Sequence, residues 1–237
     1  MKQLTQTNLL ARNNLSDQIF DLIGNQIIRN KLQPGEMIYE TKISKDLGVS
    51  RSPVRDALRM LEQIWLVERT PKGSYQVTDL SIENIQQLYE TANLLYQYAF
   101  AKAAEKATEK DLRQLEKAMT KMEESIDGND VDLYLENVTK MAHKILEIAG
   151  NPLVERIARE LMPTAERIQL ASVTYLPDQL KKVVSHIRRA YESIVMRNPK
   201  EAAKAFKDFS TAIIEVVIGS LNQSHAQNPA KKLDKAS

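Results

Sequence analysis

The sequence contains no cysteine. This absence excludes disulfides, thiol nucleophiles and zinc sites that use thiolate ligands. No apolar run is long enough to span a bilayer, and the first residues, MKQLTQTNLLARNN, lack the apolar core of a signal peptide. The motifs of a nucleophile elbow, a phosphate-binding loop and a metalloprotease helix are also missing. We therefore expect a cytoplasmic protein that is not an enzyme.

The charge of the chain is small in total but uneven in its distribution. The formal net charge is +2 over 237 residues, a length that accommodates two ordinary domains. Residues 42–59 hold five basic and two acidic side chains, whereas residues 81–237 hold equal numbers of each. A local positive excess is typical of a surface that contacts nucleic acid.

The stretch LGVSRSPVRDALRML, residues 47–61, places arginines and aliphatic residues on opposite lines. The arginines recur every four residues, at Arg51, Arg55 and Arg59. The aliphatic line consists of Val54, Leu58 and Leu61. This spacing predicts a helix with a cationic ridge about 12 Å long on one face and a core-facing stripe on the other. We expect Ser52 to cap this helix and Pro53 to occupy its first position.

The segments around this helix predict a winged helix-turn-helix over residues 10–80. A helix is expected at 15–31 with Ser16 as its cap, and a short helix at 41–47. Two strands, 66–70 and 74–78, are joined by the turn residues Pro71-Lys72-Gly73. An arginine row alone is usually a solvated helix face. Its coincidence with the preceding helix and the following hairpin favours DNA binding, with the second helix of the motif in the major groove.

Residues 81–223 predict an all-helical bundle. Six helical segments are separated by clear boundary signals, at about 81–107, 109–126, 131–149, 152–174, 178–197 and 199–222. The signals include a capping box at Thr108–Asp111 and the run Gly150-Asn151-Pro152. Residues 224–237 are polar without periodicity, so we expect a disordered tail. The fold class is therefore mainly α.

Four polar residues interrupt the apolar stripes of this bundle: His143, Arg167, His186 and Asp208. Burying such groups without partners costs about 1–3 kcal/mol each. One histidine on an apolar stripe is more often a satisfied core residue than a ligand. Four such groups on four helices favour the interpretation that they meet around a polar cavity.

Residues 15–79 resemble the winged-helix domain of GntR-type bacterial transcription regulators. The resemblance is carried by Leu32-Gln-Pro-Gly35, Glu40, the stretch 47–58, Leu61-Glu62, Leu66-Val67 and Gly73. The helical remainder, with histidines in MAHKILEIAGNPL and VVSHIRRAYESI, resembles the FadR-like branch with its FCD effector domain. The resemblance implies a homodimer on a near-palindromic DNA operator. The expected DNA-binding residues are Thr41, Lys42, Ser50, Arg51, Ser52, Pro53, Arg55, Arg59, Lys72 and Gly73.

The chain departs from the family pattern at several positions. Thr41 follows Glu40 where the family often has arginine, and Trp65 stands where glycine is usual. We expect Trp65 to be a partly buried core residue. In the first effector-domain helix, Ala92 and Tyr96 occupy the positions where the family often has arginine and glutamate.

The resemblance also implies a metal beside the effector, held by an aspartate and three histidines. His143 and His186 match, but Thr139 takes the aspartate position and Asp208 the third histidine position. The candidate ligands for Zn, Ni or Mn are thus His143, His186 and Asp208, although a metal-free pocket is the preferred interpretation. The expected effector-pocket residues are Tyr96, Thr139, His143, Arg167, His186, Tyr191 and Asp208.

These observations predict a DNA-binding transcription regulator, most consistent with a repressor. Its operator affinity is expected to respond to a small organic-acid-like effector in the C-terminal domain, with Arg167 as a carboxylate anchor. Two alternatives remain at this point: a regulator that has lost its effector, and an architectural DNA-binding protein. An enzyme with a helical catalytic domain is disfavoured because the catalytic motifs are missing.

Overall fold

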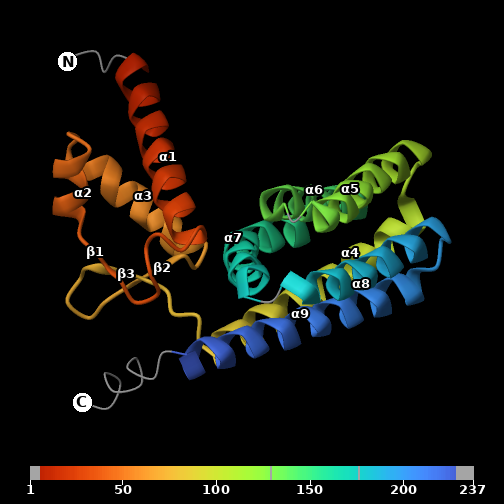
Figure 1. The fold of residues 1–237 in the computed structure, drawn as a ribbon. Coiled ribbons are helices and arrows are strands. Elements are labelled where there is room, and N and C mark those ends of the chain that lie inside the picture. The colour runs from red at the N-terminus through yellow and green to blue at the C-terminus, as the bar shows by residue number, and fades with distance from the viewer. Residues whose placement is uncertain (1–5, 129, 176, 228–237) are drawn as a thin grey trace. The chain divides into compact units, whose positions relative to one another are not determined.

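The structure of the chain is a computed structural model that describes residues 6–128, 130–175 and 177–227. Side chains are described within residues 15–126, 128, 130–170 and 181–219. The chain divides into two compact units, one ending at Leu80 and the other starting at Ser81. Figure 1 shows helices in both units and strands in the first unit alone. No helix within the described ranges is long and apolar enough to cross a membrane.

The first unit consists of three helices and a small sheet. Its helices are α1 (Gln6–Ile28), α2 (Glu40–Asp46) and α3 (Arg51–Gln63). Its strands are β1 (Met37–Ile38), β2 (Val67–Arg69) and β3 (Tyr75–Val77), in the antiparallel order β1-β3-β2. The expected hairpin is therefore confirmed. The sequence had not predicted β1, whose two residues pair with Gln76 and Tyr75 of β3.

The core of the first unit lies between α1, α3 and the sheet. Val54, Ala57, Leu58 and Leu61 of α3 are each 0% exposed and pack in a cluster with Ile19, Ile23 and Ile27 of α1. Full burial of an aliphatic side chain is worth about 1.5–3 kcal/mol. This packing fixes the rotation of α3 about its axis, so the opposite face must point to solvent.

Two helix starts differ from those expected. Helix α1 begins at Gln6, so Ser16 lies inside it and is buried. Helix α3 begins at Arg51 with Ser50 at the N-cap, which makes Pro53 its third residue. The first four N–H groups of any helix lack intrahelical partners, so the missing N–H of proline costs little anywhere in the first turn. A proline therefore marks a helix start only to within a turn.

The second unit is a bundle whose helices begin close to the expected positions. They are α4 (Ile82–Lys106), α5 (Glu109–Asp127), α6 (Val131–Ala149), α7 (Pro152–Tyr175), α8 (Pro177–Val195) and α9 (Pro199–Gln227). The capping box at Thr108 and Asp111 is confirmed, as is the left-handed Gly150 that ends α6, with φ of 66°. The last helix reaches Gln227, so residues 224–227 of the expected disordered tail are helical; residues 228–237 lie outside the described residues.

The bundle positions several helix faces around a common interior. Helix α4 packs against α6, α7, α8 and α9, while α5 pairs with α6 and α8. In Figure 1, α4, α8 and α9 run side by side along one side of this unit. The interior between α4, α6, α7 and α9 is the place where a cavity forms.

Candidate nucleic-acid interface and ligand cavity

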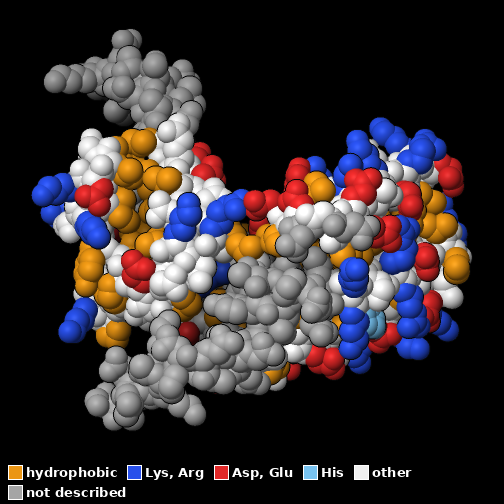
Figure 2. Space-filling view, in the orientation of Figure 1, with side chains coloured by type: hydrophobic (Ala, Val, Ile, Leu, Met, Phe, Trp, Pro, Cys, Tyr) orange, Lys and Arg blue, Asp and Glu red, His pale blue; other side chains and the backbone are white. Residues whose placement is uncertain are grey.

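The solvent face of α3 carries the expected arginine row. Arg51, Arg55 and Arg59 are all exposed, directly opposite the aliphatic residues that the core buries. On the face shown in Figure 2, Lys and Arg side chains of the first unit lie around an exposed apolar area. The helix therefore presents cationic groups outward on a rigid support.

One of the three arginines is oriented by an ion pair. Arg55 donates hydrogen bonds from Nε and Nη2 to the carboxylate of Glu40, at 3.0–3.2 Å. This bond is the main reason that the pKa of Arg55 is raised above its ordinary value. Glu40 is the first residue of α2, so the pair ties the start of one helix to the face of the next. Arg51 and Arg59 make no ion pair within the described part of the chain.

Glycines shape the two turns next to this helix. Gly48, between α2 and α3, has a φ of 65°, and Gly73, at the hairpin tip, has a φ of 80°. Such left-handed backbone is adopted readily only by glycine. At the tip, the N–H of Gly73 donates to the carbonyl of Thr70, and Lys72 beside it is exposed. The wing therefore projects a cation and a bare backbone.

The expected DNA-binding residues do not all face solvent. Seven side chains are exposed and Gly73 lies on the surface; Ser52 is half-buried and Pro53 is buried. The side chain of Pro53 therefore packs into the first unit, and its expected place at the DNA surface is not supported.

The expectation for Trp65 is wrong. Its side chain is 63% exposed, and its backbone has a φ of 63°. The N–H of Trp65 donates to the carbonyl of Glu62, and its own carbonyl accepts a hydrogen bond from Thr78 Oγ1 at 2.8 Å. The turn from α3 into β2 requires left-handed backbone here, which points the indole away from the core.

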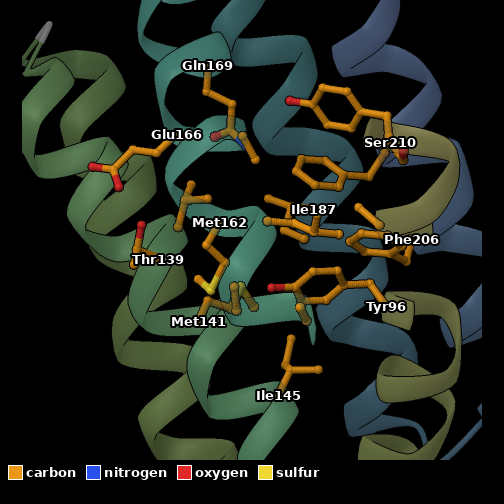
Figure 3. Close-up of a pocket in the computed structure, with 18 of the residues that line it drawn as sticks. Tyr96, Thr139, Met141, Ile145, Met162, Glu166, Gln169, Ile187, Phe206 and Ser210 are labelled. Atoms are coloured by element: carbon orange, nitrogen blue, oxygen red, sulfur yellow. The ribbon is translucent and has the colours of Figure 1, made fainter. Parts of the chain in front are cut away.

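The second unit contains a partly open cavity of about 90 Å³ (Figure 3). Helices α4, α6, α7, α8 and α9 all contribute to its lining, which is mostly apolar. A dry cavity of about 150 Å³ can hold benzene, so this one admits a smaller molecule unless its walls move. The apolar lining includes Phe100, Leu135, Met141, Ile145, Leu161, Met162, Ile187, Phe206 and Phe209.

Three buried polar atoms of the lining have no hydrogen-bond partner. They are Tyr89 Oη, Gln169 Oε1 and Ser210 Oγ. Burial raises the pKa of Tyr89, with the nearby Gln169 opposing that shift, so the phenol is protonated at neutral pH. In Figure 3, Gln169 and Ser210 lie at one end of the cavity and Ile145 at the other. Gln169 and Ser210 thus give the cavity a polar end, while its body is mostly apolar and includes the hydroxyl groups of Tyr96 and Thr139.

Of the seven expected pocket residues, two line this cavity. They are Tyr96 and Thr139. Ala92, which like Tyr96 departs from the family pattern in the first effector-domain helix, also lines the cavity. The other five lie elsewhere, so the expected convergence of polar groups on one cavity does not occur. These five are His143, Arg167, His186, Tyr191 and Asp208.

The structure shows where four of these five side chains lie. Asp208 lies 3.8 Å from Nη1 of Arg189, and Tyr191 packs beneath the guanidinium of Arg188 at 5.6 Å. His143 lines a separate open hollow between α5 and α6, where burial and then Arg159 lower its pKa. Arg167 is buried but outside the cavity lining. Spacing along one helix could not show which of these side chains turn inward.

The expected metal ligands do not fit a metal ion. Within the side chains that the structure describes, no three His, Asp or Glu residues are close enough together to hold one. His143, His186 and Asp208 come from α6, α8 and α9 and are not assembled into such a group. We therefore assign no metal chemistry to these residues.

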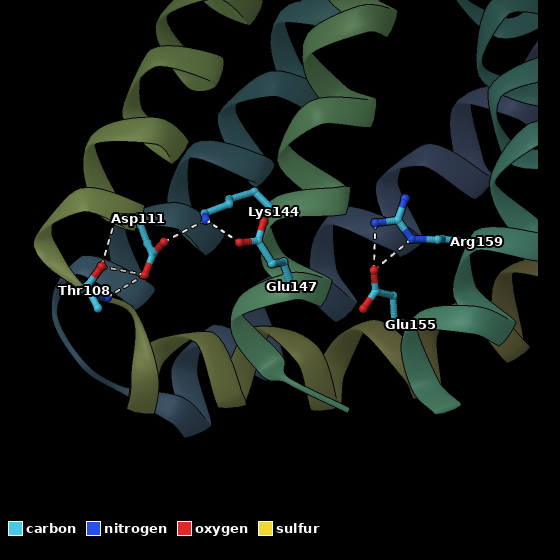
Figure 4. A network of polar contacts seen from close by, with 6 residues as sticks. All are labelled: Thr108, Asp111, Lys144, Glu147, Glu155 and Arg159. Atoms are coloured by element: carbon cyan, nitrogen blue, oxygen red, sulfur yellow. Dashed lines mark hydrogen bonds and ion pairs between the residues drawn. The ribbon is translucent and has the colours of Figure 1, made fainter. Parts of the chain in front are cut away.

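A network of polar contacts connects α6, which lines one side of the cavity, to α5 (Figure 4). Lys144 of α6 contacts Asp111 of α5 at 2.7 Å and Glu147 at 3.0 Å. Asp111 also accepts a hydrogen bond from the backbone N–H of Thr108 at 2.9 Å. The bond from Lys144, followed by those from Thr108, lowers the pKa of Asp111 to about 2. The carboxylate therefore stays charged at any physiological pH.

The chain matches two known family patterns. The pattern described as bacterial regulatory proteins of the gntR family matches residues 15–77, and that of the FCD domain matches residues 87–210. An uncharacterized HTH-type transcriptional regulator of Bacillus subtilis (strain 168), YdhC, is 26% identical over 188 residues, which cover 79% of this chain and 83% of the relative. The gluconate operon transcriptional repressor of the same organism is 25% identical over 148 residues, covering 62% of this chain and 60% of the repressor.

Solved structures share the fold. Escherichia coli McbR/YncC superposes with a TM-score of 0.72 at 17% identity, over 87% of this chain and 98% of that one. A Listeria monocytogenes protein, Lar, gives a TM-score of 0.61 at 22% identity, over 86% of this chain and 96% of that one. At these identities the likeness shows the arrangement of the chain and no more.

Proposed function

Because the chain belongs to the gntR family of bacterial regulatory proteins and carries an FCD domain, we propose that it is a homodimeric repressor that binds a specific DNA operator. The family is one of transcription regulators, and its relatives include a named repressor. The proposal adds three finer features: operator-specific DNA binding, pairing of two copies, and control by a small molecule. Each is supported by a different part of the structure.

The arginine row is the observation that carries the DNA-binding proposal. Arg51, Arg55 and Arg59 lie on the exposed face of a helix whose opposite face is 0% exposed at Val54 and Leu58. A helix of this kind fits the major groove, where arginine donates two hydrogen bonds to guanine O6 and N7. Lys72 at the wing tip is placed to contact the DNA backbone.

Exposed apolar side chains support pairing of two copies through the second unit. Leu94 and Tyr98 lie one turn apart on α4, and Leu153 and Ile157 one turn apart on α7; all four are exposed. Asn151, which directly precedes α7, donates a hydrogen bond to the hydroxyl of Tyr98 at 3.4 Å, so the two pairs are neighbours. Apolar area of this kind commonly marks an interface. A two-fold dimer would match a near-palindromic operator.

The cavity supports control by a small molecule. It lies inside the helical unit and retains buried polar atoms without partners, as sites that take a ligand often do. A ligand that binds one arrangement of the dimer better than another shifts the population toward it, with a coupling of about 1–3 kcal/mol in typical cases. The proposed consequence is a change in the spacing of the two DNA-binding units.

The test is selection of an operator from randomised duplexes, followed by fluorescence anisotropy on the selected site. Arg51→Ala should weaken binding by about 5- to 100-fold, the loss expected for one base-contacting arginine. Arg113→Ala is the matched control, because Arg113 is an exposed arginine of α5 in the other unit. If the intact protein binds unrelated duplexes as tightly as the selected one, it is an architectural protein and the proposal fails.

A further inference from the structure

We infer that the cavity binds an uncharged small molecule with an apolar body and a hydrogen-bonding end, held by Tyr89, Gln169 and Ser210. This inference rests on the proposed effector role of the cavity and names the chemistry of its ligand. It replaces the organic acid that the sequence suggested. Charge, hydrogen-bonding capacity and size each support it.

The charges around the cavity disfavour an anion. None of the described residues that line it is Lys, Arg or His, and Glu166 is the charged side chain among them. In Figure 3, Glu166 points away from the end where Gln169 and Ser210 lie. A carboxylate in this cavity would lose its hydration with no cation in the described lining, and the cation that acts on the lining is Arg159, which lies outside it near Tyr96; the loss is therefore unfavourable. An uncharged ligand avoids that cost.

The polar end of the cavity requires a ligand that donates a hydrogen bond. Gln169 Oε1 can only accept, whereas the hydroxyls of Tyr89 and Ser210 can donate or accept. All three atoms are buried and lack a partner, and they come from α4, α7 and α9. A primary amide or a hydroxyl group both donates and accepts, so it satisfies these atoms even if the side-chain amide of Gln169 is turned over.

The walls of the cavity can adapt in size. Met141 and Met162 line it side by side in Figure 3, and methionine side chains repack easily. Pro163 lies inside α7 and has no N–H to donate to the carbonyl of Arg159, so the helix is weakened at this wall. A ligand somewhat larger than the 90 Å³ cavity therefore has a wall that can yield.

The first experiment compares propanamide with propanoate, two molecules of the same shape that differ in charge. Ligand-observed NMR and melting temperature are measured on the full-length protein at neutral pH. We expect propanamide to bind and to raise the melting temperature, and propanoate to bind at least tenfold more weakly. Tighter binding of propanoate, or of propylammonium, overturns the inference, as does failure of propanamide to bind at all.

The second experiment uses Ser210→Ala and Tyr89→Phe, which remove the unpartnered hydroxyls. Each should weaken propanamide binding by about 3- to 10-fold, the net effect of one hydrogen bond. Ser210→Ala should not lower the melting temperature of the free protein, because Ser210 Oγ has no partner. Ser193→Ala is the matched control: Ser193 is buried on α8, outside the cavity, and its hydroxyl donates to the carbonyl of Arg189. An equal loss of binding in this control contradicts the assignment.

Operator binding separates the two levels of the proposal. If propanamide occupies the cavity but leaves operator affinity unchanged at saturation, the effector role fails while the ligand chemistry stands. If an acid changes operator affinity and competes with propanamide, the effector role stands while the ligand chemistry fails.

Discussion

Removing the charge of Asp111 should destabilise the helical unit by an amount set by its pKa. The carboxylate accepts bonds from Lys144 and Thr108, and these lower its pKa from 3.8 to about 2. Since one pKa unit corresponds to about 1.4 kcal/mol, the charged form stabilises the folded unit by about 2 kcal/mol. Asn can still accept a hydrogen bond at the cap, so we expect Asp111→Asn to cost about 1–2 kcal/mol at pH 7.

The cost of Asp111→Asn should decrease as the pH falls. The folded-state pKa is depressed, so the stabilisation is complete well above pH 4 and is lost as the pH falls toward 2. The difference between wild type and Asp111→Asn should shrink by about half at pH 3. The measurement is urea unfolding followed by far-ultraviolet circular dichroism. The chain has one tryptophan, Trp65, whose fluorescence reports separately on the first unit.

Glu147→Gln provides the control for Asp111→Asn. Glu147 contacts the same Lys144 at 3.0 Å, but its side chain is 68% exposed, whereas that of Asp111 is 17% exposed. Exposed ion pairs contribute little, so this variant should be nearly neutral. The reasoning is refuted if Asp111→Asn costs the same at pH 3 as at pH 7, or if the two variants are equally destabilised.

Three further predictions concern the DNA-binding unit and the dimer. Arg55→Ala should weaken operator binding by about 5- to 100-fold in anisotropy measurements. Adding Glu40→Gln should recover part of that loss, because it removes the carboxylate that Arg55 no longer pairs with. If nothing is recovered, the Glu40 carboxylate does not weaken DNA binding. Trp65→Gly should raise the stability of the first unit by about 0.5–1 kcal/mol in urea unfolding followed by circular dichroism, because relief of about 1–2 kcal/mol of left-handed strain exceeds the added entropy of the unfolded chain; a destabilised variant shows that the indole makes a needed contact. Leu153→Lys should shift the sedimentation coefficient toward that of a monomer, whereas an unchanged dimer places the interface elsewhere.

The sequence alone predicted features that depend on neighbours along the chain. The capping box at Thr108 and the left-handed Gly150 were predictable because a helix end must satisfy its own backbone groups with nearby residues. The exposed line of arginines on α3 followed from the helical repeat, because the aliphatic line had to be buried. The fold class and the family resemblance rest on signals of this local kind.

Features that depend on contacts between distant segments were missed. Strand β1 is two residues long and exists because β3 pairs with it, so it has no periodicity of its own. The exposure of Trp65 is set by the backbone that joins α3 to β2, which composition does not reveal. A bulky residue in left-handed backbone is rare, so a tryptophan at this position did not indicate such a conformation and a partly buried tryptophan was expected instead.

The lining of the cavity shows most clearly which features the sequence predicts and which depend on the tertiary structure. The family resemblance pointed to Tyr96 and Thr139, which line it, whereas the other expected pocket residues, His143, Arg167, His186, Tyr191 and Asp208, do not. The repeat along one helix determines which side chains share a face, while the packing of α4, α6, α7 and α9 determines which of those faces meet. Tyr89, Gln169 and Ser210 have no distinguishing local pattern, and only the tertiary structure brings their unpartnered atoms to one cavity.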